Sequence, residues 1–229
     1  MAQFQIKDIT KTYGRRSSQF KALKGVSFEI EKGKSVAIIG KSGSGKSTLM
    51  HLLAALDTPT TGEIYYDDKL ISRNVKKSDV NTIRNQDFGF VFQQFFLNSR
   101  DTVGKNVELP LKIAGVPFWK RRKLVEEVLK KVDLLDKINS NAGDLSGGQK
   151  QRVCIARAIV NNPKVIFADE PTGNLDTVTG EQIVNLLFEL NKALAITLVV
   201  VTHDNDLATR CEKILRMQDG LIINSENKL

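Results

Sequence analysis

Nine consecutive residues have the types and the spacing of a phosphate-binding loop: Gly40, Lys41, Ser42, Gly43, Ser44, Gly45, Lys46, Ser47 and Thr48. Glycines let the backbone curl so that successive N–H groups point at one anion, and a helix start adds unpaired donors. Lys46 can then reach the β- and γ-phosphates, while the Ser47 hydroxyl can hold Mg²⁺. The loop therefore predicts binding of a nucleoside triphosphate.

The sequence on either side of this loop supports the same interpretation. The apolar run 36–39 precedes it, and a helical pattern follows with Leu49, Leu52, Leu53 and Leu56 on one face. A flexible glycine–serine linker, which is the simpler alternative, has no reason to lie between a buried strand and an amphipathic helix.

Three further apolar runs end in polar residues that suit triphosphate chemistry. These residues are Gln93 after residues 88–92, Asp169 and Glu170 after residues 165–168, and His203 after residues 197–201. In parallel α/β sheets, ligands bind outside the carboxyl ends of the strands. We therefore expect these residues to converge with the phosphate loop on one crevice.

Each of these residues has a role that hydrolysis requires. Mg²⁺ prefers hard oxygen ligands, which Ser47, Gln93 and Asp169 supply. Glu170 is the expected general base or water-orienting group, and His203 is expected to hydrogen-bond the γ-phosphate. A single acidic residue often caps a strand or pairs with a lysine, so the argument depends on the whole set lying in one place.

The N-terminal part of the chain predicts antiparallel strands. Residues 4–10 and 26–30 alternate apolar and polar side chains, as half-exposed strands do. Between them we expect a loop that begins at residues 11–14. Tyr13 in this loop is as compatible with packing as with stacking on a nucleobase.

The middle of the chain predicts helices. A short strand at 63–66 and a turn at Asp67 and Asp68 precede a surface helix at 72–86. From about residue 94 to residue 151, Pro110 and Pro117 punctuate helices and no run resembles a central strand. The helix after residues 145–149 is apolar on nearly every face, so it should be buried.

The remaining elements complete an α/β fold. A helix at about 179–194 joins the strands at 165–168 and 197–201, and a hairpin at 214–217 and 221–223 follows. We expect a P-loop ATPase core with a mostly parallel sheet, an N-terminal antiparallel β subdomain and an inserted α-helical subdomain. The prediction is one domain over 1–229, with the core at about 1–93 and 152–229 and the helical subdomain at about 94–151.

Composition narrows the class of protein. The chain has 229 residues, of which 41% are hydrophobic and 26% charged, a composition typical of soluble globular proteins. No apolar segment is long enough to span a bilayer, and the N-terminus lacks the regions of a signal peptide. Cys154 and Cys211 do not form a disulfide framework, so we expect a reducing cytoplasm, with Cys154 as a small core side chain.

The net charge of +8 leaves three interpretations open: attraction to nucleotide phosphates, to anionic lipid or to nucleic acid. The one dense basic cluster, residues 120–123, opens a helical stretch with a single apolar stripe. A solvated helix face is favoured, a lipid-proximal patch comes second, and nucleic acid third because no aromatic-interleaved basic motif accompanies the cluster.

With these residues placed, the chain resembles the nucleotide-binding subunit of an ATP-binding cassette (ABC) transporter from about residue 4 to residue 224. The signature motif is the most discriminating, because many unrelated ATPases share the phosphate loop. It comprises Leu145, Ser146, Gly147, Gly148 and Gln149. By the same resemblance, Tyr13 matches the A-loop, residues 40–48 match Walker A, and Gln93 matches the Q-loop. Residues 165–170 match Walker B, residues 173–176 with Asp176 match the D-loop, and His203 matches the switch histidine.

The resemblance implies a mechanism and partners. Two cassettes would stack head to tail, each signature helix facing the γ-phosphate held by the other, so that ATP joins the dimer and hydrolysis releases it. The start of that helix is itself suited to an anion. Gln93 would report the state of the nucleotide to the helical subdomain, which docks on integral membrane permease subunits. ATP and Mg²⁺ are the implied cofactors, and no nucleic acid is expected as a partner. The implied location is cytoplasmic, on the inner face of the cell membrane.

Within the family, residues 56–62, 90–94, 107–111 and 171–176 are similar to the lipoprotein-releasing and macrolide-exporter type. That type implies export or extraction of a lipoprotein, peptide or drug-like cargo. Residues 98–105 depart from the leucine- and proline-containing segment usual there.

Two other functions compete with transport. A mechanical signalling cassette that drives cell-envelope remodelling has the same motifs, so nothing in the chain separates it from a transporter subunit. Cassettes of DNA repair carry a very long coiled coil, and those of translation carry two cassettes in one chain. The compact insert between residues 48 and 145 and the single cassette make both of these unlike this chain.

Overall fold

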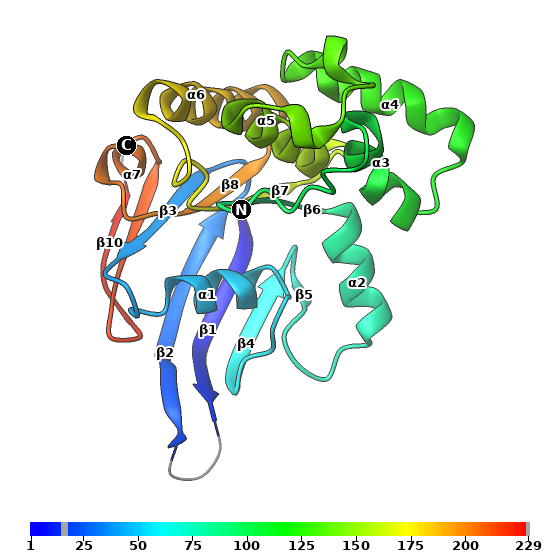
Figure 1. The fold of residues 1–229 in the computed structure, drawn as a ribbon. Helices are drawn as coiled ribbons and strands as arrows, with labels where there is room; N and C mark the ends of the chain where they lie inside the picture. Colours follow the sequence, from blue (N-terminus) through cyan, green and yellow to red (C-terminus); the bar gives the residue numbers. More distant parts are fainter. Residues whose placement is uncertain (15–17, 228–229) are drawn as a thin grey trace. The chain divides into compact units, whose positions relative to one another are not determined.

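The computed structural model describes residues 1–14 and 18–227, which form two compact units. The first unit consists of Met1–Asn81 and Thr197–Leu229, and the second of Thr82–Ile196. Figure 1 shows the elements of both units. Among the described residues, no helix combines the length and the apolar content needed to cross a membrane.

One sheet of the first unit is antiparallel, with the strand order β2-β1-β4-β5. Its strands are β1 (Ala2–Tyr13), β2 (Phe20–Glu31), β4 (Thr61–Tyr66) and β5 (Lys69–Leu70). Alternate side chains of β1 and β2, such as Phe4, Ile6, Val26 and Ile30, are buried. The prediction of antiparallel strands at the N-terminus is thus confirmed.

The expected loop at residues 11–14 is wrong for three of its four residues. Lys11, Thr12 and Tyr13 continue β1, and Tyr13 pairs with Phe20 of β2. The ladder extends because it gives these backbone groups hydrogen-bond partners, and β-branched and aromatic residues suit a strand. The strand ends at Tyr13, and Gly14, which follows it, has φ +84°.

The first unit also contains strands in the order β10-β9-β3-β8, of which β9, β3 and β8 are parallel to one another. The strand β3 (Ser35–Gly40) lies between β8 (Thr197–Val201) and β9 (Lys213–Gln218) and is parallel to both. The last strand, β10 (Leu221–Asn227), forms the expected hairpin with β9. Two helices accompany them: α1 (Lys46–Leu53) and α7 (Asn205–Thr209).

Two helix boundaries differ from the sequence-based expectation. Ala55, at φ +52°, turns the chain after α1, so Leu56 lies beyond the helix and is exposed. The surface helix α2 (Lys77–Gln86) has no buried residue, as expected, but begins five residues late. The reason is that the buried Ser72 Oγ accepts a hydrogen bond from Ile64 N at 3.0 Å, which holds this stretch against β4.

The second unit combines two parallel strands with four long helices. The strands β6 (Phe88–Phe92) and β7 (Val165–Asp169) pair in parallel. The helices are α3 (Val103–Ile113), α4 (Phe118–Lys131), α5 (Gly147–Ile159) and α6 (Thr177–Leu194), with short 3₁₀ turns at Leu135–Lys137 and Ala142–Asp144. Pro117 caps α4, whereas Pro110 lies inside α3 and does not end it, contrary to expectation.

The helix α5 is buried, as its sequence indicates, and contacts β6, α3, α4 and α6. Burial raises the pKa of the Cys154 thiol to about 11, although Arg157 opposes this shift, and the thiol donates to the carbonyl of Phe95. Arg157 donates to the carbonyls of Phe95 and Phe96. The predicted α/β class, with an antiparallel sheet and mostly parallel further strands, is confirmed.

Candidate functional site

The phosphate loop is shaped by glycine at positions that exclude a side chain. A Cβ on Gly40 would lie 2.3 Å from the carbonyl oxygen of Met217, and one on Gly45 would lie 2.7 Å from that of Ala22. Gly43 and Gly45 have φ of +78° and +100°, in the left-handed region that favours glycine. The loop's backbone path therefore depends on these residue types.

Lys46 begins α1, and its side chain bends back across the loop. Its Nζ donates to the carbonyls of Gly40 at 2.8 Å and of Lys41 at 3.0 Å. A positive charge is thus fixed beside the N-terminal N–H groups of α1, where anions are stabilised.

Ser44 supplies an observation that a ligand would explain. The residue is 4% exposed, and its Oγ has no hydrogen-bond partner among the described residues. A buried hydroxyl without a partner carries a desolvation cost, and such groups call for an explanation. A phosphate oxygen in the loop would accept this bond, so the loop fits a nucleotide.

Tyr13 is fixed near the start of α1 by a small polar cluster. Its hydroxyl donates to Asp57 Oδ2 at 2.9 Å, and Lys11 Nζ lies 2.6 Å from Asp57 Oδ1 and 4.9 Å from the centre of the tyrosine ring. Burial and the bond to Asp57 raise the pKa of Tyr13, against a hydrogen bond with Thr48. Burial opposes ionisation of Asp57, but its bonds from Lys11, Thr58 and Tyr13 hold its pKa below the usual value.

The first unit brings His203 to the same sheet edge as the phosphate loop. The strands β3 and β8 are parallel, with Ile38 opposite Val201, so both chains leave the sheet at the same end. Thr202 N donates to the carbonyl of Ile38 at 3.2 Å, which anchors the residue before His203. The histidine is exposed at this edge.

The second unit brings together Gln93, Asp169 and Glu170. Phe92 lies opposite Asp169 in the parallel pair of β6 and β7, so the residues after both strands leave the sheet at one end. Glu170 has φ +45°, a backbone conformation that costs a non-glycine residue about 1–3 kcal/mol. Such strain is common at functional sites.

A buried glutamine that the sequence did not single out supports this turn. Gln151 of α5 is 0% exposed, and its Nε2 donates to the carbonyl of Pro171 at 2.7 Å and to that of Phe92 at 3.4 Å. One side chain therefore joins the end of β6 to the residue after Glu170. The only signal for it in the sequence is a polar residue within a helix predicted to be buried.

Asn174 was also absent from the predicted site residues, although it lies in the D-loop match. Its Nδ2 donates to the carbonyl of Gln93 at 2.8 Å, and Gln93 Nε2 donates to Asn174 Oδ1 at 3.3 Å. A Cβ on Gly173 would lie 2.8 Å from Gln93 Nε2. The Q-loop and the D-loop are therefore in direct contact.

The signature residues form a closed helix cap. Ser146 caps α5 by accepting from Gln149 N at 3.3 Å, and the Gln149 side chain accepts in return from Ser146 N at 3.0 Å. A Cβ on Gly148 would lie 2.4 Å from Thr179 Cγ2 of α6, so glycine is required for this packing. Leu145 is buried, and Gly147 has Leu175 as its nearest contact.

Asp176 of the D-loop has a structural role that the sequence did not predict. Its carboxylate accepts from Thr179 N at 3.0 Å and caps α6. Hydrogen bonds with Thr179 lower the pKa of this carboxyl group. Any role of Asp176 in a dimer must leave this helix cap intact.

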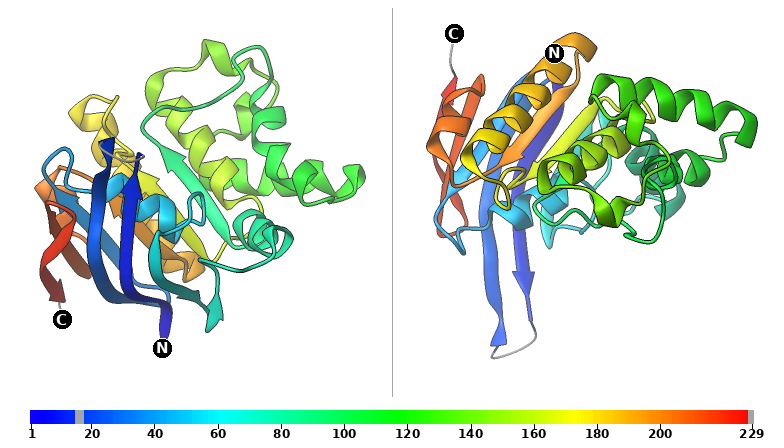
Figure 2. Two further views of the ribbon diagram at one scale, coloured as in Figure 1. Left: turned by 90° about the horizontal axis from the view of Figure 1, so that it is seen from below. Right: turned by 45° about the horizontal axis from the view of Figure 1, so that its top comes forward.

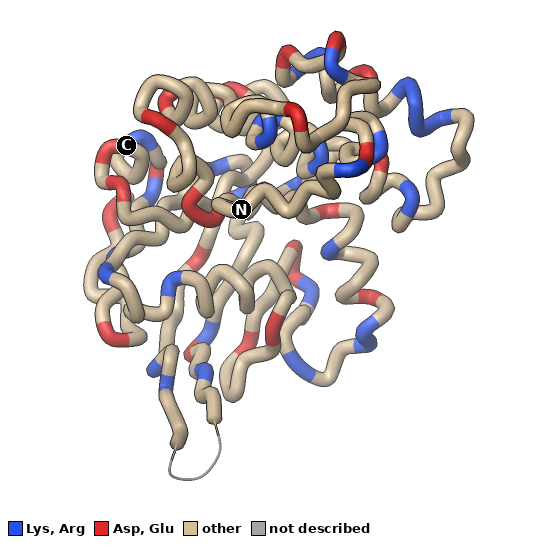
Figure 3. Tube along the Cα trace, in the orientation of Figure 1, with Lys and Arg blue, Asp and Glu red and all other residues tan. Residues whose placement is uncertain are grey.

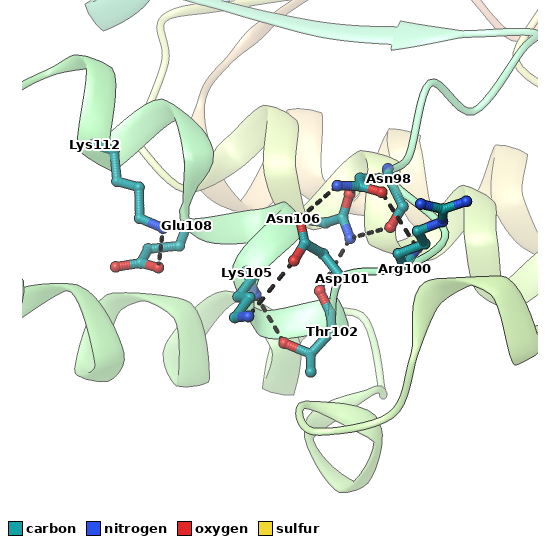
Figure 4. Close-up of polar contacts among 8 residues, drawn as sticks. All are labelled: Asn98, Arg100, Asp101, Thr102, Lys105, Asn106, Glu108 and Lys112. Carbon is teal, nitrogen blue, oxygen red and sulfur yellow. Dashed lines mark hydrogen bonds and ion pairs between the residues drawn. The ribbon is translucent and has the colours of Figure 1, made fainter.

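The segment 98–105 forms a polar cluster at the start of α3 (Figure 4). Asn106 is buried and receives a bond from Asn98 N at 2.8 Å, and it donates to the carbonyls of Asn98 and Thr102. Thr102 caps α3 by accepting from Lys105 N at 3.3 Å. Polar side chains thus build a helix start here.

The site residues fall into two groups, each assembled within one unit. Tyr13, the phosphate loop and His203 belong to the first unit, and Gln93, Asp169, Glu170, Asp176 and the signature belong to the second. Their convergence on one nucleotide stays a prediction. Among residues 1–14 and 18–227, no group of three or more His, Cys, Asp or Glu side chains could hold a metal ion.

Comparison with known proteins gives consistent matches. The family model described as "ABC transporter" matches residues 23–173. An uncharacterized ABC transporter ATP-binding protein of Methanocaldococcus jannaschii, MJ1508, is 44% identical and aligns over 98% of this chain and 99% of its own length. The macrolide export ATP-binding/permease protein MacB of Hyphomonas neptunium is 42% identical over 98% of this chain, which spans 35% of that protein.

A solved structure agrees with the fold. The ATP-binding cassette MJ0796 of M. jannaschii, in a dimeric post-hydrolysis state bound to ADP and Pi, has a TM-score of 0.88 and 42% identity, with 98% of each chain covered.

Proposed function

Because this chain belongs to the ABC transporter family as an ATP-binding subunit, we propose that its two groups of site residues act on one ATP molecule. The chain is an ATPase that energises a membrane transporter by ATP-driven dimerisation. The observation that carries the proposal is the phosphate loop, with Lys46 Nζ fixed across it and His203 at the same sheet edge.

The predictions of family, ATPase activity and transport are confirmed by these matches, and the envelope-remodelling alternative is not favoured.

The proposed division of the chain is one ABC ATPase domain with its core at about 1–93 and 152–229 and its helical subdomain at about 94–151. The residue roles below are proposals in the same way.

The first group binds ATP. The loop amides and Lys46 hold the phosphates, and the buried Ser44 hydroxyl donates to a phosphate oxygen. The adenine stacks on Tyr13. Since Lys11 covers one face of that ring, the base takes the other.

Mg²⁺ would be held by Ser47, Gln93 and Asp169, whose oxygen atoms are the donors this ion prefers. When bound, the ion neutralises phosphate charge. The hydrogen bonds between Gln93 and Asn174 fix the position of Gln93 and aid this role.

Hydrolysis requires a base and a contact to the γ-phosphate. Glu170 accepts the proton of the attacking water, and its position is fixed by the turn that Gln151 supports. His203 hydrogen-bonds the γ-phosphate. In the dimer, the N–H groups at the start of α5 face the γ-phosphate of the second cassette.

The proposed partners are a second copy of the cassette and integral membrane permease subunits, and no nucleic acid. These partners place the chain on the cytoplasmic face of the cell membrane. The proposed cargo class is a lipoprotein, peptide or drug-like molecule, exported or extracted from the membrane.

Dimerisation tests the proposal directly. Glu170→Gln should bind ATP and accumulate as a dimer in sedimentation velocity runs, while ADP leaves it monomeric. The matched control is Glu189→Gln on the exposed face of α6, which should turn over ATP and show no trapped dimer. An ATP-bound Glu170→Gln protein that stays monomeric would refute the dimer mechanism. Identification of the co-purifying membrane protein would test the partner.

A further inference from the structure

The turn between α3 and α4 presents three large apolar side chains to solvent. We call residues 112–123 the hairpin tip. Within it, Ile113, Phe118 and Trp119 are 68%, 74% and 67% exposed, and the two aromatic rings contact each other at 5.2 Å. Single exposed apolar residues are ordinary, but here two touching aromatic rings and a third apolar side chain are exposed within seven positions. In the views of Figures 1 and 2, the start of α4 (green) stands away from the other helices of the second unit.

The same tip carries positive charge that is only partly compensated. The hairpin tip contains five basic residues and no acidic residue, and the nearest acidic residue before it is Glu108. Glu108 already lies 2.9 Å from Lys112 and 3.4 Å from Arg121, and Arg122 pairs with Glu126 at 2.8 Å. Within the described chain, neither Lys120 nor Lys123 has an ion-pair partner. Figure 3 shows the Lys and Arg residues along the start of α4.

We propose that the hairpin tip binds the surface of an anionic lipid bilayer. Aromatic side chains are favoured at the membrane–water interface, and a segment with basic and aromatic residues lies in that interface. Trp119, Phe118 and Ile113 enter the headgroup region, while Lys120 and Lys123 meet the lipid phosphates. The inference rests on the proposed function only because membrane partners hold the chain near a bilayer.

Charge favours lipid over a protein partner as the occupant. The unpaired side chains at the tip are cations, and they match a surface of uniform negative charge. A protein partner is the alternative, because a cavity of about 320 Å³ beside Phe118 and Arg122 has the volume to take a side chain. Glu108 and Lys105 line that cavity as well, so its charge is mixed, unlike that of the tip.

Trp119 makes the experiment direct, because it is the single tryptophan of the chain. The full chain is mixed with vesicles of phosphatidylcholine containing about one third phosphatidylglycerol, and with vesicles of phosphatidylcholine alone. We expect the emission of Trp119 to shift to shorter wavelength, and brominated lipid to quench it, only with the anionic vesicles. High salt should weaken the binding.

The charge-reversal variant Lys120→Glu with Lys123→Glu tests the basic side chains. Lys120 lies in the first turn of α4, where an acidic residue suits the helix dipole, and Lys123 is exposed in the next turn, so both changes are compatible with folding. Each basic residue near an anionic surface contributes about fivefold to affinity, so the double variant should bind at least about 25-fold more weakly. The control is Lys76→Glu with Lys77→Glu, which makes the same change of net charge at exposed residues near α2 and should keep the affinity.

Three results would overturn the proposal. Unchanged Trp119 emission with anionic vesicles would mean that the tip is a solvated surface. Vesicle binding without quenching of Trp119 would mean that another face binds lipid. A shift that appears only with the permease in detergent would assign the tip to a protein partner. The vesicle assay needs neither ATP nor the permease, so ATP hydrolysis measured on the same samples separates failure of this proposal from failure of the proposed function.

Discussion

The two groups of site residues are held in place in different ways. In the first unit, nine contiguous residues carry the loop, and its shape follows from glycine torsions and from Lys46 bonding to two carbonyls within six residues. In the second unit, the end of β6 and the turn after β7 are joined by Gln151 and Asn174, which are distant in sequence from Gln93.

This difference predicts which property, nucleotide binding, turnover or stability, a substitution in each unit should change. A change in the phosphate loop alters a local structure and should affect mainly nucleotide binding. A change in the second unit removes support between distant segments and should affect turnover or stability with smaller effects on affinity. The predictions below test that division, from the largest expected effect to the smallest.

The largest effect is expected for Glu170→Gln. Removal of a positioned general base costs about 10²–10⁴-fold in rate, so kcat should fall by this amount while the Kd for ATP stays unchanged. Phosphate release and calorimetry measure the two quantities. A variant that hydrolyses ATP at the normal rate would show that Glu170 is not the base, and Glu189→Gln serves as the control.

Lys46→Ala should act on binding. The loss of a charged hydrogen-bond donor to the phosphates is worth about 1.5–3 kcal/mol, which corresponds to an affinity about 10- to 150-fold weaker. Titration calorimetry with ATP measures it. Lys32→Ala removes an exposed lysine before β3 and should bind as the wild type does. Undiminished affinity of Lys46→Ala would contradict the assignment of the loop.

Gln151→Met should act on stability and turnover. The substitution keeps the length of the side chain but leaves the carbonyls of Pro171 and Phe92 without this donor, so unfolding should become easier by about 1–3 kcal/mol. We also expect a lower kcat with a nearly unchanged Kd for ATP. Urea unfolding and phosphate release test both, with the exposed Gln182→Met as control. If Gln151→Met lost only ATP affinity, the prediction that changes in the second unit act mainly on turnover and stability would be wrong.

The smallest effect concerns the cluster around Tyr13. The pKa of Asp57 is below its ordinary value of 3.8 in the folded chain, so its carboxylate contributes stability above that pH and loses it as the pH falls through the folded pKa. Between pH 6 and pH 3, wild type should therefore lose more stability than Asp57→Asn, as judged by urea midpoints. Equal losses would mean that the ion pair with Lys11 contributes nothing.

The comparison between the units also explains how far sequence reasoning reached. The phosphate loop, the buried strands and the buried helix α5 were predictable, because glycine spacing and apolar periodicity act over a few residues. The predictions that put Leu56 and Ser72 in helices are wrong, since a positive φ at Ala55 and the contact of Ser72 with Ile64 override the local pattern. The prediction of a loop at Tyr13 is wrong because its place in β1 depends on pairing with Phe20, which lies on another strand.

The sequence by itself therefore determined the fold class, the phosphate loop, the signature and the family to which they belong. Only the tertiary structure revealed Gln151 and Asn174 as supports of the catalytic turn, Asp176 as a helix cap and Thr179 as the reason for Gly148. The physical reason is the separation in sequence over which each interaction acts. Torsional preference and periodicity are properties of neighbouring residues, whereas a hydrogen bond or a steric contact between distant segments exists only once the chain has folded.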